Sequence, residues 1–465
     1  MAMFQLVTWA QQAVSLDEVR QAGLHVIHIT TVNGEEPQGK IIANPYAPTE
    51  TFNYTYTNKV PCRIVITMGG DSLYDSGDYE EDAGGATIRI NGNTTAYYSE
   101  PLNMPYKLKL EKSRDLLLRG DDQLYADKHW RLLKDAMSLN TITGLHLSRL
   151  IGMEWTAAYM PCNVVINGDY RGCYLLMETV RRNNRCRIST DKQTGFIVER
   201  DPYWWKEEKY FATSWYEQAI SYRWTWKYPS EEDVTEETEL AVSDCINSAE
   251  KAIKNGSYTE HLDTASFARW LLAHDILGTR DSGGSNMFIK KYDDTASSLL
   301  QMPCLWDFDS SFEMAAGSYS RLHTSANAYF STLFQSNNKA FARAYVRLWN
   351  DIKDRLCTQL LSFIDNYSHS EEAMALDASR RLYNKRWAVA YPTVASDAHS
   401  VTAWLQSHLS LLDAAIQQID TISTNEVIPI PVRNAEKQCY DLVGRRLTKG
   451  RQGLCIQKGK IYFVK

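Results

Sequence analysis

The residues whose types and spacing best suit chemistry lie in the loop TRDSGGSN, past the middle of the chain. Asp281 and Asn286 are separated there by two glycines and two serines. An aspartate carboxylate can accept a hydroxyl proton, and an asparagine amide oxygen can bind a metal ion. Ordinary turns contain the same residue types, so the loop by itself is also consistent with a simple turn.

A second acidic segment, PCLWDFD, strengthens the functional interpretation. After Asn286 the sequence predicts a strand, a turn at DDTASS and a returning strand that ends at Asp307. Because antiparallel strands lie about 5 Å apart, Asn286 and Asp307 are expected to be neighbours, beside Asp281. Such oxygen ligands suit Mg²⁺, which takes one or two carboxylates plus substrate phosphates. Asp309 is interpreted either as a further metal ligand or as an N-cap.

The step from Asp281 to Asn286 is also that of the catalytic loop of protein kinases, and a kinase-like site needs a cation for the phosphates. In YKLKL, Lys107 and Lys109 share one face of a predicted strand. The preceding turn, with Gly92 and Asn93, has backbone N–H groups that can bind a phosphate. The alternative is a strand whose lysines simply face water.

Composition limits the other possibilities. The net charge of −6 and the pI near 6.0 argue against a nucleic-acid partner, because phosphate backbones select basic surfaces. No apolar run approaches the roughly 18 residues of a membrane-spanning segment. The first 30 residues lack an export signal, so we expect any such signal to lie outside this sequence. Neither a C-x-x-C pair nor a Walker A, H-E-x-x-H or G-x-S-x-G motif occurs.

The elements that must position these residues change in kind along the chain. Residues 22 to 110 have β-branched runs between turn residues, which predict a sheet, and 124 to 151 have helical spacing. Two apolar runs around Asn167–Gly168 predict a hairpin. Long helices are predicted over 232–255, 264–277, 339–365, 369–389 and 400–421. The predicted organisation is α+β, with an extension (1–21), a β-rich nucleotide-binding lobe (22–180), a helical lobe with the catalytic hairpin (181–424), and a linker and β-type tail (425–465).

Six segments in order resemble the CotH kinase family, whose members look like atypical protein kinases. They are GLHVIHITTVNGE, IRINGNTT, PYKLKLEK, NVVINGDYRGCYLLMETV, TRDSGGSN and PCLWDFDSSF, within residues 22 to 420. The resemblance implies a two-lobed kinase-like fold that uses ATP with Mg²⁺ or Mn²⁺. The roles it implies are a phosphate lysine at Lys109, an adenine hinge at Met177, Glu178 and Thr179, a catalytic Asp281, and metal ligands at Asn286 and Asp307.

Two departures from the family's sequence pattern, and the C-terminal tail, affect the functional interpretation. Asn91 stands where the family has arginine, and the run KDAMSLN departs from the family's arginine-containing pattern. The segment CYDLVGRRLTKGRQGLCIQKGKIYFVK resembles a C-terminal module of exported Bacteroidetes proteins. The sequence therefore favours transfer of the ATP γ-phosphate to Ser or Thr of a secreted or surface protein. The alternatives are a non-catalytic surface binding protein, and a kinase or nucleotidyl transferase with another acceptor.

Overall fold

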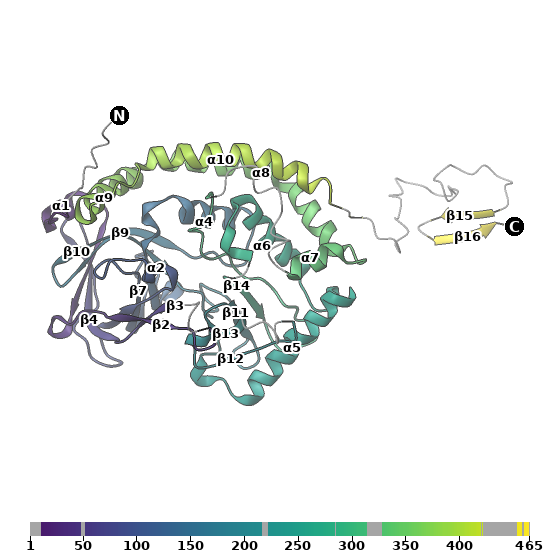
Figure 1. The fold of residues 1–465 in the computed structure, drawn as a ribbon, viewed down its shortest axis with the longest axis horizontal. Coiled ribbons are helices and arrows are strands. Elements are labelled where there is room, and N and C mark those ends of the chain that lie inside the picture. Colours follow the sequence, from purple (N-terminus) through teal and green to yellow (C-terminus); the bar gives the residue numbers. More distant parts are fainter. Residues whose placement is uncertain are drawn as a thin grey trace. The chain divides into compact units, whose positions relative to one another are not determined.

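The computed structural model describes residues 11–47, 52–215, 222–283, 285–313, 328–419, 421, 453–457 and 460–464. The chain divides into two compact units, Met1–Thr421 and Ile422–Lys465. The first unit is a mixed α+β structure in which a β-rich part is followed by a helical part, drawn in purple to blue and in teal to green in Figure 1. This agrees with the predicted α+β class.

A closed barrel of seven strands forms the β-rich part. Its strand order is β1-β9-β10-β8-β7-β6-β4, and β4 pairs back with β1, while β5 extends the sheet from β4. Apolar side chains that alternate along the strands fill its interior, among them Ile64, Leu108 and Trp130. The strands are β1 (His25–Thr31), β4 (Val60–Met68), β5 (Asp71–Asp75), β6 (Ala86–Ile90), β7 (Tyr106–Arg114), β8 (Asp127–Leu133), β9 (Tyr159–Ile166) and β10 (Asp169–Glu178).

The predicted hairpin is confirmed, and one predicted helical segment is partly wrong. Strands β9 and β10 are joined by Asn167 and Gly168, both with positive φ, as a tight hairpin turn requires. The helical spacing predicted from residue 124 includes β8, and the main helix of this region is α4 (Asn140–Leu150). Trp130 and Leu132 point into the barrel, and such short apolar runs fit a strand as well as a helix.

A second, four-stranded antiparallel sheet contains strands from before and after the Asp281 loop. Its order is β12 (Tyr210–Phe211), β13 (Arg223–Tyr228), β11 (Phe196–Asp201) and β14 (Met287–Lys291). Strand β14 is the first strand of the hairpin predicted after Asn286. The returning segment is not a regular strand, because it pairs with β14 only through one bridge between Lys290 and Gln301. A small hairpin of β2 (Gly39–Ala43) and β3 (Phe52–Tyr56) forms a separate two-stranded sheet that packs against the barrel.

Helix α6 lies in the centre of the helical part and ends where the candidate loop begins. Most of its side chains are buried, including that of His274. It ends at Gly278, where φ is +60° and a Cβ atom would lie 2.7 Å from the Trp404 ring, so the position requires glycine. The helices are α1 (Leu16–Gln21), α2 (Thr94–Tyr97), α3 (Asp122–Tyr125), α5 (Glu236–Asn255), α6 (Thr264–Leu277), α7 (Ala328–Gln335), α8 (Ala340–Ser368), α9 (Glu371–Trp387) and α10 (Val394–Ile416).

Helix α4 belongs to the core of the helical part, although it follows the barrel strand β8. Its residues pack in one apolar cluster with those of α6, α8 and α10. Gly144 in α4 faces the Phe308 ring, which a Cβ atom would approach to 2.3 Å. Phe308 separates the two acids Asp307 and Asp309, so this close contact fixes the segment that carries them.

The second unit contains β15 (Gly453–Gln457) and β16 (Lys460–Val464), which pair antiparallel. The predicted linker at 425–434 lies outside the described residues.

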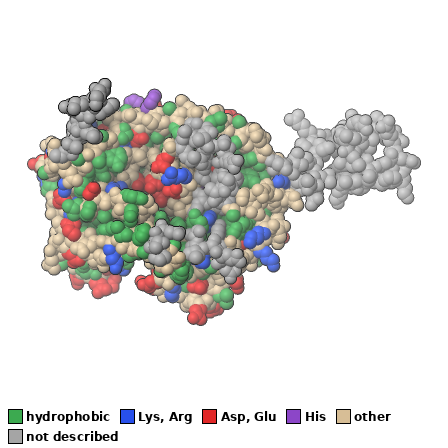
Figure 2. Space-filling model, viewed as in Figure 1, with side chains coloured by type: hydrophobic (Ala, Val, Ile, Leu, Met, Phe, Trp, Pro, Cys, Tyr) green, Lys and Arg blue, Asp and Glu red, His purple; other side chains and the backbone are tan. Residues whose placement is uncertain are grey.

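None of the helices in the described ranges combines the length and apolarity needed to cross a membrane. On the face of the molecule shown in Figure 2, acidic side chains gather near the middle, next to basic ones.

Candidate active site

Asn286 and Asp307, which the sequence predicted to be neighbours, are in contact. The Asn286 Nδ2 donates a hydrogen bond to the Asp307 Oδ2 at 3.0 Å. Both residues have left-handed backbone conformations, with φ of +58° and +63°. Such conformations are uncommon for residues other than glycine. They persist only where the surrounding structure holds them, and they occur most often at functional sites.

Hydroxyl groups join the loop of Asp281 to the segment that follows Asp307. The Asp281 backbone N–H donates to Ser310 Oγ at 3.2 Å, and the Thr279 and Ser311 hydroxyls lie 3.0 Å apart. At the start of α4, the Asn140 amide donates to the carbonyls of Asp309 and Ser311, both at 2.9 Å. Hydrogen bonds therefore join the Asp281 loop to the segment that follows Asp307, and α4 binds that segment through Asn140.

Asp281 itself is open to solvent. Its side chain is 51% exposed, and its Oδ1 lies 3.3 Å from Nε of the more exposed Arg280. Asp309 is exposed as well, while Asp307 is only partly exposed. The predicted catalytic acid is thus accessible to an acceptor, next to the more enclosed contact of Asn286 with Asp307.

The site gathers carboxylates that repel one another. Burial, followed by the charges of Asp309, Asp135 and Asp281, raises the pKa of Asp307 well above its usual range. Asp135 was missed by sequence reasoning, although it stands in the divergent run KDAMSLN. Burial and the charge of Asp309 raise its pKa to about 6, against a hydrogen bond from Thr141. Hard oxygen donors crowded in this way suit a divalent cation. Within the described ranges, no three His, Cys, Asp or Glu side chains form a complete metal site by themselves.

The raised pKa of Asp135 predicts a pH-dependent gain in stability for Asp135→Asn. Between about pH 4 and pH 6, the folded parent holds a proton that the unfolded chain has lost, so its stability falls as the pH rises. The variant lacks this titration. In metal-free buffer, we expect equal stabilities near pH 4 and a more stable variant at pH 7. Urea unfolding at both pH values measures this, and a difference that does not change with pH would contradict it.

The two lysines of β7 differ in their surroundings. Lys109, the predicted phosphate lysine, is exposed, whereas Lys107 on the same face is partly buried. Lys107 lies directly across from Arg89 on β6 and Arg131 on β8. Burial and then these arginines lower its pKa well below the usual value. The geometry therefore favours Lys107 over Lys109 as the cation that an anionic ligand would neutralise.

The glycine turn before α2 is packed within the protein. Gly92 has a φ of +97°, and Asn93 precedes the first turn of α2. The Asn93 Oδ1 accepts hydrogen bonds from Lys206 Nζ at 2.7 Å and from Asn53 Nδ2 at 3.3 Å. The Asn93 side chain thus already has structural partners, and a phosphate contact from this turn would come from its backbone.

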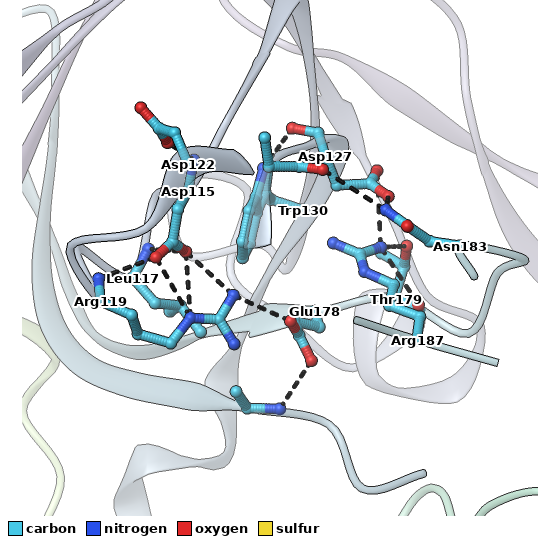
Figure 3. A network of polar contacts seen from close by, with 12 residues as sticks. Asp115, Leu117, Arg119, Asp122, Asp127, Trp130, Glu178, Thr179, Asn183 and Arg187 are labelled. Carbon is cyan, nitrogen blue, oxygen red and sulfur yellow. Dashed lines mark hydrogen bonds and ion pairs between the residues drawn. The ribbon is translucent and has the colours of Figure 1, made fainter. Parts of the chain in front are cut away.

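The polar groups of the predicted hinge also have partners. The three residues concerned are buried: Met177, Glu178 and Thr179. Figure 3 shows the Glu178 carboxylate beside Arg119, whose Nη2 donates to Oε1 at 3.0 Å. The other oxygen accepts from the Ala158 backbone N–H at 3.0 Å. Arg187 donates to the carbonyl of Thr179 and to its hydroxyl, at 3.2 and 2.8 Å. This segment is therefore held firmly by its own neighbours.

Arg187→Ala should destabilise the protein strongly. The Arg187 side chain is completely buried, pairs with Asp127 at 3.6 Å, and bonds the carbonyls of Thr179 and His129. Its removal leaves the Asp127 carboxylate buried without its cation, which typically costs about 3–5 kcal/mol. Urea unfolding measures the loss. Arg63→Ala, which breaks an exposed pair with Asp75, serves as the control and should cost less than about 1 kcal/mol. Similar losses for both would contradict the prediction.

Comparison with known proteins gives one family match. The family described as CotH kinase protein matches residues 88–395, about two-thirds of the chain. No curated protein matches the chain. The matched region contains the Asp281 loop, the segment of Asp307 to Ser311, the lysines of β7 and the helix α4 that binds this segment.

Proposed function

The chain belongs to the CotH kinase protein family, and we propose that it is an atypical kinase that transfers the γ-phosphate of ATP to Ser or Thr of another protein. Membership in a kinase family implies ATP as the phosphate donor. We further propose that the barrel and the helical part correspond to the two lobes of a kinase-like fold. The site residues at 281–309 lie on the helical side, and the cationic face of β7 lies on the barrel side.

In this proposal, Asp281 orients the acceptor hydroxyl and accepts its proton. The acceptor oxygen forms a bond to the γ-phosphorus while the bond to the β–γ bridging oxygen breaks, and that electron pair leaves with ADP. Asn286 and Asp307 would hold Mg²⁺ or Mn²⁺, with Asp309 as a further candidate ligand. When bound, the metal supplies positive charge to the phosphate oxygens. Lys107 supplies a second positive charge from the barrel.

The observation that carries this proposal is the hydrogen bond between Asn286 and Asp307. It brings the Asp-x-x-x-x-Asn loop and the Asp-Phe-Asp segment together although 20 residues separate them in sequence. The crowding of carboxylates around Asp307 is the charge distribution that a bound cation relieves. The resemblance of the tail to a module of exported proteins supports an exported or surface acceptor.

Labelled nucleotides test the proposal directly. The full chain is incubated with Mg²⁺ or Mn²⁺, a generic protein acceptor, and ATP labelled in either the γ- or the α-phosphate. We expect γ-label on Ser or Thr of the protein and no transfer of α-label. Transfer of the α-label would identify a nucleotidyl transferase instead. If neither label is transferred and calorimetry detects no nucleotide binding, the alternative of a non-catalytic surface binding protein is correct.

A further inference from the structure

Three cationic side chains stand in a row across neighbouring barrel strands. Arg89 of β6 lies directly across from Lys107 of β7, which lies directly across from Arg131 of β8. The residues that flank them in sequence point into the barrel interior, so the row lies on the outer face of the sheet. Like charges directly opposite one another destabilise a sheet. The row therefore carries a cost that a bound anion would remove.

Acids within the described ranges act on the row only from a distance: the charges of Glu199, Glu207 and Asp307 act on Arg131, and that of Glu207 acts on Arg89. No hydrogen bond or ion pair joins Arg89, Lys107 or Arg131 to any residue within the described ranges. Arg89 stacks on the Tyr56 ring at 3.9 Å, and no acid within the described ranges forms an ion pair with it. The Arg131 Nε is buried without a hydrogen-bond partner. A buried donor left in this state costs free energy, and it commonly marks the place of an unseen ligand.

Arg131 lies beside the segment that carries the candidate metal ligand Asp307. Its guanidinium lies 5.3 Å from the centre of the Trp306 ring, and Trp306 directly precedes Asp307. The negative charges of Glu199 and Asp307 both act on Arg131, against the effect of burial and of Arg89. An anion that extends from Lys107 to a cation held by Asp307 would therefore pass Arg131.

We propose that Arg131 binds the terminal phosphate of ATP, and this inference rests on the proposed kinase function. A triphosphate chain has the length and the repeated negative charge to neutralise a row of cations. A guanidinium offers several N–H donors in a fixed plane, which suits phosphate oxygens. During transfer, negative charge spreads over the oxygens of the γ-phosphate, so a donor fixed at that place also lowers the barrier.

The ratio of ATP to ADP affinity separates this role from a structural one. Calorimetry with Mg-ATP and Mg-ADP is carried out on the full chain and on Arg131→Gln, and turnover is measured alongside. Because hydrogen bonds between charged groups are among the strongest, we expect ATP binding to weaken by about 10-fold or more. ADP lacks the terminal phosphate, so its affinity should change less than about 3-fold. Turnover should fall by about 10²-fold or more.

Two further variants sharpen the test. Lys128→Gln, which removes a partly exposed cation of the same strand, should leave both affinities and turnover unchanged. Arg131→Lys keeps the charge but not the planar donors, and should recover only part of the ATP affinity. Because misfolding weakens both nucleotides alike, an equal change for ATP and ADP, or no change for either, would overturn the proposal. A parent that binds neither nucleotide would instead refute the kinase function on which it rests.

Discussion

Asp307→Asn should abolish metal-dependent nucleotide binding and lower turnover by about 10³-fold or more. The substitution removes a full ligand charge from the cation, while the amide keeps nearly the same shape. Asp307 also contacts Asn286, so the change affects both proposed metal ligands together. Titration calorimetry of ATP, with and without Mg²⁺, measures the binding, and transfer of γ-label measures the turnover.

A stability measurement shows whether the Asp307→Asn protein is folded. Burial and the neighbouring acids raise the pKa of Asp307, so its ionised form opposes folding above that pKa. The neutral amide should therefore make the metal-free variant melt at a higher temperature than the parent at pH 7. An inactive variant that melts lower would be explained by misfolding. Unchanged Mg-ATP affinity would exclude Asp307 as a metal ligand.

Asp281→Asn should separate turnover from binding. Asp281 is more exposed than Asp307, and its proposed role is to orient a hydroxyl and accept its proton. Losing a positioned general base lowers turnover by about 10²-fold or more, whereas the Mg-ATP affinity should stay close to that of the parent. The same calorimetry and labelled-ATP assay, applied to both aspartate variants, compare the two roles.

Asp294→Asn is the matched control for the Asp281 variant. Asp294 is an exposed acid in the turn DDTASS, beyond β14, and no proposed role involves it. Its replacement should change neither binding nor turnover. If Asp281→Asn weakens Mg-ATP binding as much as Asp307→Asn does, the assignment of separate roles to the two aspartates is wrong.

The local parts of the fold could be predicted from sequence, whereas the pairing of distant strands could not. Helix α6 and the β9–β10 hairpin follow from residue spacing and from the turn residues beside them. Closure of the barrel depends on β1 pairing with both β4 and β9. The residue periodicity of a strand does not show which other strands it pairs with. The contact of Asn286 with Asp307 was predicted from a hairpin, although a single bridge is enough to bring these residues together.

The sequence could not predict the surroundings of side chains whose neighbours come from distant segments. Lys107 and Lys109 share a face, so only the arginines across from Lys107 distinguish them. Nothing in the sequence distinguishes Asp135, because its raised pKa depends on burial and on the charge of Asp309, which only the fold brings near. The hinge role of Glu178 stays a prediction, and the sequence did not show that its carboxylate is bound by Arg119, which lies in a loop far away in sequence.

The closure of the barrel determines the shortest part of this chain that we expect to fold independently. The family match begins at residue 88, after β1 and β4, and ends at 395, inside the first turn of α10. A fragment with those ends would leave β9 without β1 and β6 without β4, and α6 and α8 without α10. Unpaired strand edges next to an opened apolar interior promote aggregation. The shortest autonomous folding unit that we expect therefore extends from β1 to α10.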